Sequence, residues 1–329
     1  MIKNYFKIAW RNLVKSKGYS AINIGGLAVG MAVAMLIAFW IYDELSYNQF
    51  HKNYDRIAQV MQHQTFNGEK GTQRSIPIPL AGELKNNYGS NFKYLVMASG
   101  QGERILSAGD KKLSVEGNYM DADAARMLSL KMLKGNYDGL KDPHSILLSA
   151  SAAKSIFGNE DPMDNLMKIG NKLDVKVTGV YEDLPSNTQF RKLHFIAPWD
   201  LYASSEKWIQ EARDQWGYNS FQLFAQIDEY ADFDKLNALI KNVKLDKVAD
   251  DDKRFKPEIF LFPMSQWQLR SNWENGIQTG GLIQYVWLFG IVGVFVLLLA
   301  CINFMNLSTA RSEKRAREVG IRKAVGSDR

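Results

Sequence analysis

Two apolar runs without a single charge constrain the fold of this 329-residue chain more than any other feature. They cover residues 19–42 and 282–307. At about 1.5 Å per residue, helices of these lengths extend about 36–39 Å, and a hydrocarbon core is about 30 Å thick. We therefore expect two transmembrane helices, at residues 19–42 and 282–307.

The charges are distributed unevenly around these runs. Residues 1–18 hold five Lys or Arg and no acid, and residues 308–329 hold seven bases and three acids. The rest of the chain is net negative, although the whole carries +6. Because basic residues favour the cytoplasmic side of a membrane, we expect both ends in the cytoplasm and residues 43–281 outside it. The same distribution argues against a nucleic-acid partner.

The first run is too long for a cleaved signal peptide and has no A-x-A site, which favours an uncleaved anchor. Ahead of it, the apolar positions of residues 1–18 recur at helical spacing opposite the bases, which predicts an amphipathic helix in the cytoplasmic interface, on membrane lipid. The only cysteine, Cys301, lies in the second run, so no disulfide is expected.

Small residues recur every four positions along the first run. They are Gly26, Gly30, Ala34 and Ala38. Small residues allow another membrane helix to approach closely, so this stripe predicts a helix-packing face. Its partner is either the second span or another subunit.

The middle region has the pattern of a mixed α/β domain. Residues 56–66, 77–89 and 92–99 predict strand, helix and strand, and residues 220–227, 232–245 and 257–264 repeat that order. Between them we expect a smaller inserted subdomain, from about residue 115 to 198. It contains a strand at "SILLS", a helix at "ASAAKSIFG" with Ser149 as its cap, and a hairpin around Gly170-Asn171. The fold class is therefore α+β, with two transmembrane helices flanking this domain.

Motifs for catalysis and metal binding are missing from the sequence. There is no phosphate loop, H-E-x-x-H, C-x-x-C or G-x-S-x-G. We interpret the four histidines, His51, His63, His144 and His194, as surface or turn residues. The acidic stretch "DEYADFD" is expected to cap the helix that follows it. We expect no active site, no metal site and no cofactor bound by this chain.

The terminal stretch "RAREVGIRKAVG" is more than a basic anchor, because apolar positions and two glycines interrupt its bases. Behind an apolar span it resembles the coupling segment of FtsX-like ABC transporter permeases, R-x-x-E-I-G-x-x-x-A-x-G. The start "KIAWRNLVKSKGYSAINIGGLAVGMA" resembles the first span of that family. The block from "NYMDADAARMLSLKMLKG" through "SILLSASAAKSIFGNEDP" to "VKVTGVYEDLP" is similar to the MacB-type periplasmic core domain.

The resemblance implies a mechanism and partners. Such permeases dimerise, as two copies or with a paralogue, and a cytoplasmic ABC ATPase supplies ATP and Mg²⁺ chemistry. ATP-driven closure moves the periplasmic domain, which has two Porter-like β-α-β units and the inserted subdomain. The process driven is export, lipoprotein release or force transmission in the envelope, with a periplasmic adaptor as a further partner. The implied location is the bacterial inner membrane. The implied ATPase contacts are Arg315, Arg317, Glu318, Gly320, Arg322, Lys323 and Gly326.

The sequence departs from the family in two places. The family commonly has Gly where this chain has Asp164, and its members have at least four spans, so we expect this chain to be the N-terminal part of a longer permease. A two-span sensor with an extracytoplasmic ligand-binding domain has the same topology, but residues 308–329 show no heptads. A membrane-tethered enzyme would need a catalytic cluster, which the sequence does not show.

Overall fold

The structure, a computed structural model, describes residues 4, 7, 10, 11, 14 and 17–326, without the side chains of residues 310, 311, 314 and 315. The amphipathic helix expected at residues 1–18 lies largely outside these residues. The chain forms two compact units, which we describe separately. One unit contains the helical ends of the chain, and the other is an α/β domain, Ser46–Leu282.

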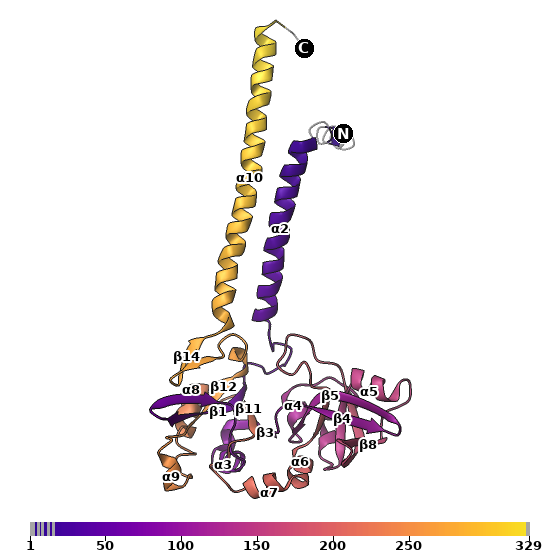
Figure 1. Cartoon of the computed structure of the whole chain (residues 1–329), viewed down its shortest axis with the longest axis vertical. Coiled ribbons are helices and arrows are strands. Elements are labelled where there is room, and N and C mark those ends of the chain that lie inside the picture. The colour runs from indigo at the N-terminus through magenta and orange to yellow at the C-terminus, as the bar shows by residue number, and fades with distance from the viewer. Residues whose placement is uncertain (1–3, 5–6, 8–9, 12–13, 15–16, 327–329) are drawn as a thin grey trace. The chain divides into compact units, whose positions relative to one another are not determined.

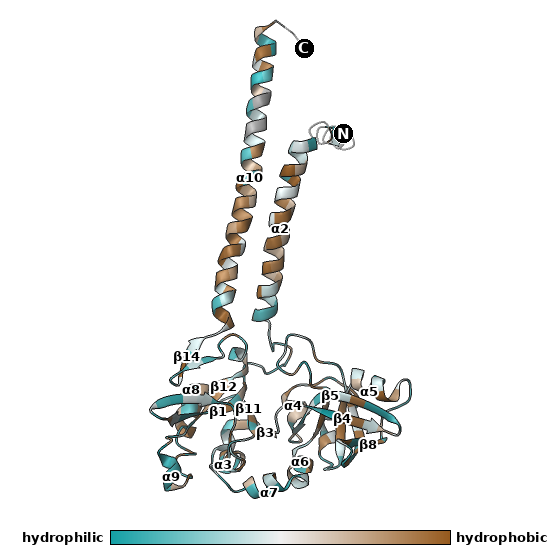
Figure 2. Cartoon of the chain, viewed as in Figure 1, coloured by the Kyte–Doolittle hydropathy of each residue, from teal (hydrophilic) through white to brown (hydrophobic). Residues whose placement is uncertain are grey.

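The first unit contains two long helices, α2 (Lys17–Leu45) and α10 (Leu282–Ala324) (Figure 1). Both apolar runs are helical along their whole length, and Figure 2 shows brown, apolar residues along each helix. Residues Lys17–Leu45 and Leu282–Thr309 are long and apolar enough to cross a membrane. Large apolar side chains such as Phe39 and Phe295 are exposed on these helices, as lipid-facing side chains would be.

The core of the α/β domain is a sheet in which two β-α-β units interleave. The first unit is β1 (Ile57–Phe66), α3 (Pro79–Tyr88) and β3 (Phe92–Ala98); the second is β11 (Gln222–Ile227), α8 (Phe233–Ile240) and β12 (Glu258–Pro263). The strand order is β3-β11-β1-β12, and β11 and β12 both run antiparallel to β1. The edge strand β2 (Glu69–Gln73) pairs with β1.

Alternation along the strands gives this sheet two buried faces. Val60, Leu223 and Leu261 point to the face that α3 and α8 cover with Leu84 and Ile240. The neighbouring residues Ile57, Phe224 and Phe262 point to the opposite face and belong to a second core. Successive side chains of a strand point to opposite faces, so both faces of β1 are apolar.

The second half of the domain is a ring of six strands. Its order is β5-β10-β7-β9-β8-β4, and parallel pairing of β10 with β5 closes it. The ring begins with β4 (Gly102–Ala108), whereas the expected insert began at residue 115. Its other strands are β5 (Lys111–Met120), β7 (Ser145–Ser149), β8 (Leu166–Ile169), β9 (Leu173–Tyr181) and β10 (Phe195–Pro198). Its interior holds a third core, with Ile146, Val177 and Phe195.

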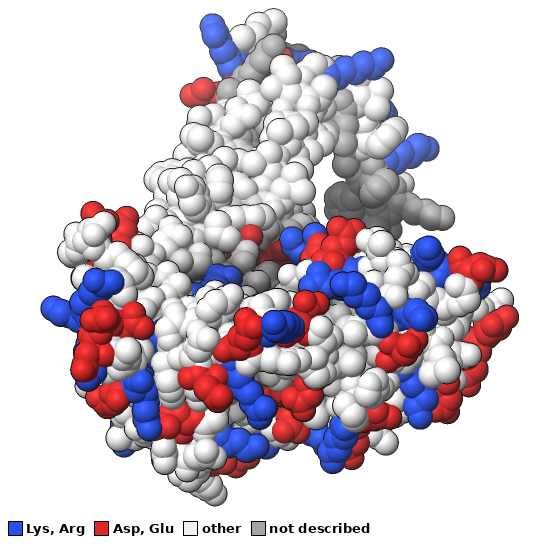
Figure 3. Space-filling view, turned by 60° about the horizontal axis from the view of Figure 1, so that its bottom comes forward, with Lys and Arg blue, Asp and Glu red and all other residues white. Residues whose placement is uncertain are grey.

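Short elements complete the domain. They are η1 (Gly89–Asn91), α4 (Ala124–Met127), β6 (Met132–Gly135), η2 (Tyr137–Leu140), α5 (Ala150–Phe157), α6 (Trp199–Ser205), α7 (Lys207–Ala212), α9 (Asp250–Lys253), η3 (Met264–Gln266), β13 (Asn272–Glu274) and β14 (Ile277–Gly280). Figure 3 shows acidic and basic residues interspersed over the face of this domain that it presents.

The structure contains the helix caps and the hairpin turn that the sequence predicts. The Ser149 side chain accepts a hydrogen bond from the backbone N–H of Ala152 at the start of α5. Asp232 caps α8 through the N–H groups of Asp234 and Lys235. Gly170 and Asn171 have φ of 61° and 59°, the left-handed pair that a tight hairpin turn requires.

Candidate functional site: the helix pair and the domain segments next to it in the chain

Helices α2 and α10, the helix pair, contact each other along a seam of small residues. A Cβ built on Gly30 would lie only 2.5 Å from the Cβ of Ala300, so only glycine permits this approach. A Cβ on Gly26 would lie 3.2 Å from Nδ2 of Asn303. Ala34 is half-buried, whereas Ala38 is exposed. Gly26 and Gly30 of the predicted stripe thus face α10, and Ala38 does not.

The buried face of α2 has a seven-residue repeat rather than a four-residue one. Its buried and half-buried residues include Ser20, Asn23, Leu27, Gly30, Ala34, Ile37 and Ile41. This alternation of three and four residues is the pattern of helices that wrap around each other. Glycines of α10 face the same seam, because Cβ atoms on Gly293 and Gly290 would lie 3.3 Å from Ile37 and 3.7 Å from Ile41.

Two asparagines lie at the apolar seam, Asn23 buried and Asn303 exposed, and the sequence-based predictions did not include them. Asn23 is 5% exposed, its Nδ2 lies 3.3 Å from the Tyr19 hydroxyl, and its Oδ1 is buried without a partner among the described residues. Asn303 lies on the facing helix, next to Gly26. Polar side chains inside membrane spans are costly and mark helix contacts or functional sites. A search of both runs for amides finds these two residues together with Gln284 and Asn306.

The terminal segment, residues 308–326, is part of α10 as far as Ala324, without a break after the apolar run. Gly320 lies inside the helix, where an added Cβ would have no atom within 4 Å, and Gly326, with φ of 78°, follows the end of the helix. Arg317, Glu318, Arg322 and Lys323 are all exposed. The side chain of Arg315 lies outside the described part. Ile321 and Val325, one turn apart, are also exposed, and so the helix presents apolar and charged side chains together.

Directly after α2 in the chain, a buried polar network anchors the start of the domain. Asn48, His51 and Thr188 are all 0% exposed. The Asn48 side chain accepts a hydrogen bond from the Gln189 N–H at 2.9 Å. Nδ1 of His51 lies 2.7 Å from the Leu128 carbonyl, and its Nε2 lies 2.9 Å from the Thr188 hydroxyl.

His51 therefore corrects the sequence interpretation, because it is a buried core residue rather than a surface one. Burial lowers its pKa, although the Leu128 carbonyl opposes this. In the resulting neutral ring, Nδ1–H donates to that carbonyl. The network joins the segment after α2 to the loop before β10, and sequence spacing alone does not reveal such a distant pairing.

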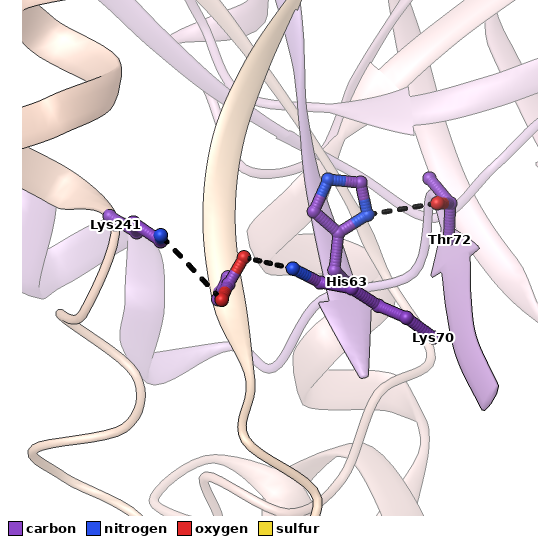
Figure 4. Close-up of polar contacts among 5 residues, drawn as sticks. His63, Lys70, Thr72 and Lys241 are labelled. Atoms are coloured by element: carbon purple, nitrogen blue, oxygen red, sulfur yellow. Dashed lines mark hydrogen bonds and ion pairs between the residues drawn. The ribbon is translucent and has the colours of Figure 1, made fainter. Parts of the chain in front are cut away.

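Ahead of α10, the hairpin β13–β14 is held by an aromatic cluster. The ring of Trp273 lies 5.2–5.5 Å from the rings of His63, Phe260 and Phe262. His63 stacks on Phe260 at 4.3 Å, and its Nδ1 lies 2.8 Å from the Thr72 hydroxyl (Figure 4). Burial and then nearby Lys70 lower the pKa of His63 to about 4, so the ring is neutral near pH 7.

Beside His63, two lysines share one carboxylate. Lys70 and Lys241, both labelled in Figure 4, lie 2.5 Å and 3.6 Å from the Glu258 carboxylate oxygens. Burial raises the pKa of Glu258, but its interactions with Lys70, Lys241 and His63 together outweigh burial, and the net shift of the pKa is downward. Within the described residues no three His, Cys, Asp or Glu side chains gather to hold a metal ion. This cluster is arranged for holding the hairpin on the sheet, since its charges are paired and its rings are packed.

The helix pair and the interleaved α/β domain together are typical of a membrane-anchored domain. Comparison with known proteins identifies the family to which this domain belongs. The sequence matches the MacB-like periplasmic core domain family over residues 20–243. The chain belongs to this family. The match agrees with the resemblance to FtsX-like ABC transporter permeases, and together with the two apolar helices it makes the chain a membrane protein.

One solved structure shares the fold, and two others are similar to this chain more weakly. A domain described as that of a permease from Porphyromonas gingivalis is 15% identical, with a TM-score of 0.53 over 71% of this chain and 97% of that one. The periplasmic region of MacB from Actinobacillus actinomycetemcomitans is 17% identical, with a TM-score of 0.46 over 67% of this chain and 96% of that one. The extracellular domain of the noncanonic ABC-type transporter YknZ from Gram-positive bacteria is 13% identical, with a TM-score of 0.43 over 62% of this chain and 99% of that one. The curated proteins contain no match.

Proposed function

We infer that this chain is a permease subunit that couples ATP hydrolysis by a partner ATPase to movement of its α/β domain. The observation that carries this inference is the continuity of α10, which runs for 43 residues from Leu282 to Ala324. Its apolar part and its basic terminal part are one helix. A force applied to the terminal segment would therefore act directly on the span, without a loop that could absorb it.

The expected ATPase contacts all lie on this terminal segment. Arg322 and Lys323 are exposed and could pair with acids on the partner, while Ile321 and Val325 offer apolar surface for a groove. Contacts of this mixed kind combine charge steering with apolar anchoring. The partner would bring ATP and Mg²⁺, because this chain has no phosphate loop.

The proposal also includes location and assembly. Both ends of the chain would lie in the cytoplasm and the α/β domain in the periplasm, with the helix pair in the bacterial inner membrane. A second permease copy or a paralogue would complete a dimer.

The test is recovery of the ATPase with variant permeases purified as they occur in the cell. Arg322→Glu with Lys323→Glu should reduce recovery at least about tenfold, because a buried charge contact costs about 2–5 kcal/mol when one partner is lost. The matched control is Lys111→Glu with Lys112→Glu, an exposed pair on the α/β domain. Unchanged ATPase recovery and unchanged transport with the first pair would contradict the proposal, since the segment would then be only a basic anchor.

A further inference from the structure

A polar cavity of about 220 Å³ lies in the α/β domain and is lined by residues of that domain. Its volume is several times the ~30 Å³ share of one water molecule, which leaves room for a ring-sized ligand. Its polar lining side chains are Gln59, Arg74, Gln101, Asn118, Gln189 and Gln222. Its apolar lining consists of Phe190, Phe224 and Trp267.

The sheet register brings two of the amides to one face. Gln59 of β1 lies directly opposite Phe224 of β11, and Gln222 precedes Phe224 by two residues on the same strand. Alternate residues of a strand share a face, so both glutamines and Phe224 point the same way. Asn118 is nearby, and its Oδ1 accepts a hydrogen bond from Ser99, which orients the Asn118 amide group.

Most polar side chains that line this cavity make no hydrogen bond within the described part of the protein. Gln59 is only 5% exposed, yet its side chain hydrogen-bonds to no residue in the part of the chain that the structure describes. The same holds for the side chains of Arg74, Gln101, Gln189 and Gln222. A buried amide without a partner costs free energy, and Gln59 is such an amide. Gln189 and Gln222 are half-buried, whereas Arg74 and Gln101 are exposed. Gln59 at the wall of this cavity therefore points to a polar occupant.

The aromatic side of the cavity is rigid. The Trp267 indole N–H donates to the Phe262 carbonyl at 2.8 Å, which fixes the orientation of the ring. Phe224 and Phe190 lie 5.7 Å and 6.2 Å from it, centroid to centroid. Aromatic rings, inclined to one another by 51–66°, are therefore held beside a set of amides that can each both donate and accept hydrogen bonds.

We propose that this cavity binds a neutral or singly anionic saccharide of about one ring. Sugar hydroxyls both donate and accept, as carboxamides do, and the C–H face of a sugar ring packs against an aromatic side chain. Among the described lining residues there is no carboxylate, so a ligand with a free ammonium group, such as an amino acid or a peptide N-terminus, would lack a counter-charge. Arg74, which makes no ion pair with a described residue, accommodates one acidic group.

The test is calorimetric titration of the purified chain in phospholipid nanodiscs, which contain no sugar-headed detergent. The probes are glucose, N-acetylglucosamine and glucuronate, with N-acetylalanine methylamide as the peptide-like comparison. We expect saturable binding of at least one sugar. Gln59→Leu and Gln222→Leu should each weaken that binding about 3- to 10-fold, the effect of one neutral hydrogen bond. Gln215→Leu, an exposed glutamine on another surface, is the matched control.

A second readout separates binding from folding. Because Gln59 is buried without a hydrogen bond, Gln59→Leu should leave the thermal unfolding temperature unchanged or raise it while weakening sugar binding. Gln222 is half-exposed, so its variant tests binding even if the Gln59 variant misfolds. The proposal is overturned if no sugar binds, if only the peptide-like probe binds, or if both leucine variants bind sugar normally. None of these outcomes depends on the ATPase, so they leave the coupling proposal standing.

Discussion

Asp164 is a residue at which this chain departs from the family pattern. The family commonly has glycine here, and in this chain Asp164 has φ of 61°, in the left-handed region. Its backbone N–H donates to the Val177 carbonyl, which fixes this conformation. Asp tolerates left-handed backbone better than most residues, and glycine adopts it without strain. The turn is therefore kept although the glycine is not.

The first prediction follows from this conformation. Asp164→Gly should leave stability unchanged or raise it by up to about 1 kcal/mol, whereas Asp164→Ala should lower it by about 1 kcal/mol. The measurement is the free energy of unfolding in urea. Asp164 forms an exposed ion pair with Lys176 at 3.5 Å. Asp174→Ala is the control, because Asp174 forms a similar pair with Lys168 at 3.4 Å, and such pairs contribute little. Equal effects of Ala and Gly at residue 164 would rule out backbone strain as the cause.

His63 gives a prediction about pH. Its pKa is about 4 in the folded protein against 6.5 for the free side chain, so between these values the unfolded chain binds more protons. Stability from this residue is therefore complete above about pH 6.5 and is lost as the pH falls toward 4. Asp121 gives stability a pH dependence of the opposite sign, because burial raises the pKa of Asp121 from 3.8 to about 6.

The His63→Phe variant isolates this residue from Asp121. Phenylalanine keeps a ring to stack on Phe260 but cannot take up a proton. As the pH falls from about 6.5 to 4, the wild type should lose stability relative to the variant, as followed by the tryptophan fluorescence of unfolding. A constant difference between the two proteins across this range would show that His63 does not titrate as inferred.

At the scale of the elements, helix geometry explains why only part of the predicted stripe faces α10. Four residues advance a helix by about 400°, so residues four apart rotate by about 40° at each step. Gly26 and Gly30 face α10, but by Ala38 the stripe has turned away and is exposed. A seven-residue repeat drifts only about 20° per repeat, and it is this repeat that stays buried.

Whether a feature could be predicted from the sequence depends on whether its residues are close together or far apart in the chain. The Ser149 cap and the Gly170-Asn171 turn were predictable because each depends on a few consecutive residues. The closure of the six-stranded ring, where Ile196 pairs with Asn118, depends on residues far apart in the chain. The cavity glutamines were missed for the same reason, since they come together only through strand register and loop placement.

The close approach at Gly30 gives the prediction for the helix pair. Gly30→Leu should separate α2 from α10, because even a Cβ atom there would lie 2.5 Å from Ala300. The reporter is a disulfide between Ile37→Cys and Gly293→Cys, whose Cβ positions lie 3.7 Å apart, close to the ~3.8 Å of a disulfide. Native Cys301 is first changed to alanine.

The expected result is a severalfold lower yield of this disulfide with Gly30→Leu. Gly25→Leu is the matched control, because a Cβ at Gly25 has no atom within 4 Å. It should leave the yield unchanged. If both leucine variants crosslink like the parent, the seam does not depend on glycine at residue 30.

For the whole molecule, the central hypothesis is that the α/β domain and the terminal segment lie on opposite sides of a membrane. Basic residues gather at residues 1–18 and 308–329, and the domain between the apolar runs is net negative. Moving such basic clusters across a membrane is unfavourable, so the two clusters should share the cytoplasmic side. Coupling to a cytoplasmic ATPase requires this arrangement, since only then can one helix link the ATPase to the domain.

Two single cysteines, each in a Cys301→Ala background, test this arrangement from both sides. Asp251→Cys lies on the exposed turn α9 of the domain and should react with a membrane-impermeant thiol reagent in intact spheroplasts. Lys323→Cys is exposed on the terminal segment and should react only after lysis. Both should react fully in detergent, which controls for local accessibility. If Asp251→Cys is protected and Lys323→Cys is labelled, the chain is inserted the other way round, and a cytoplasmic ATPase could not reach the segment proposed to receive it.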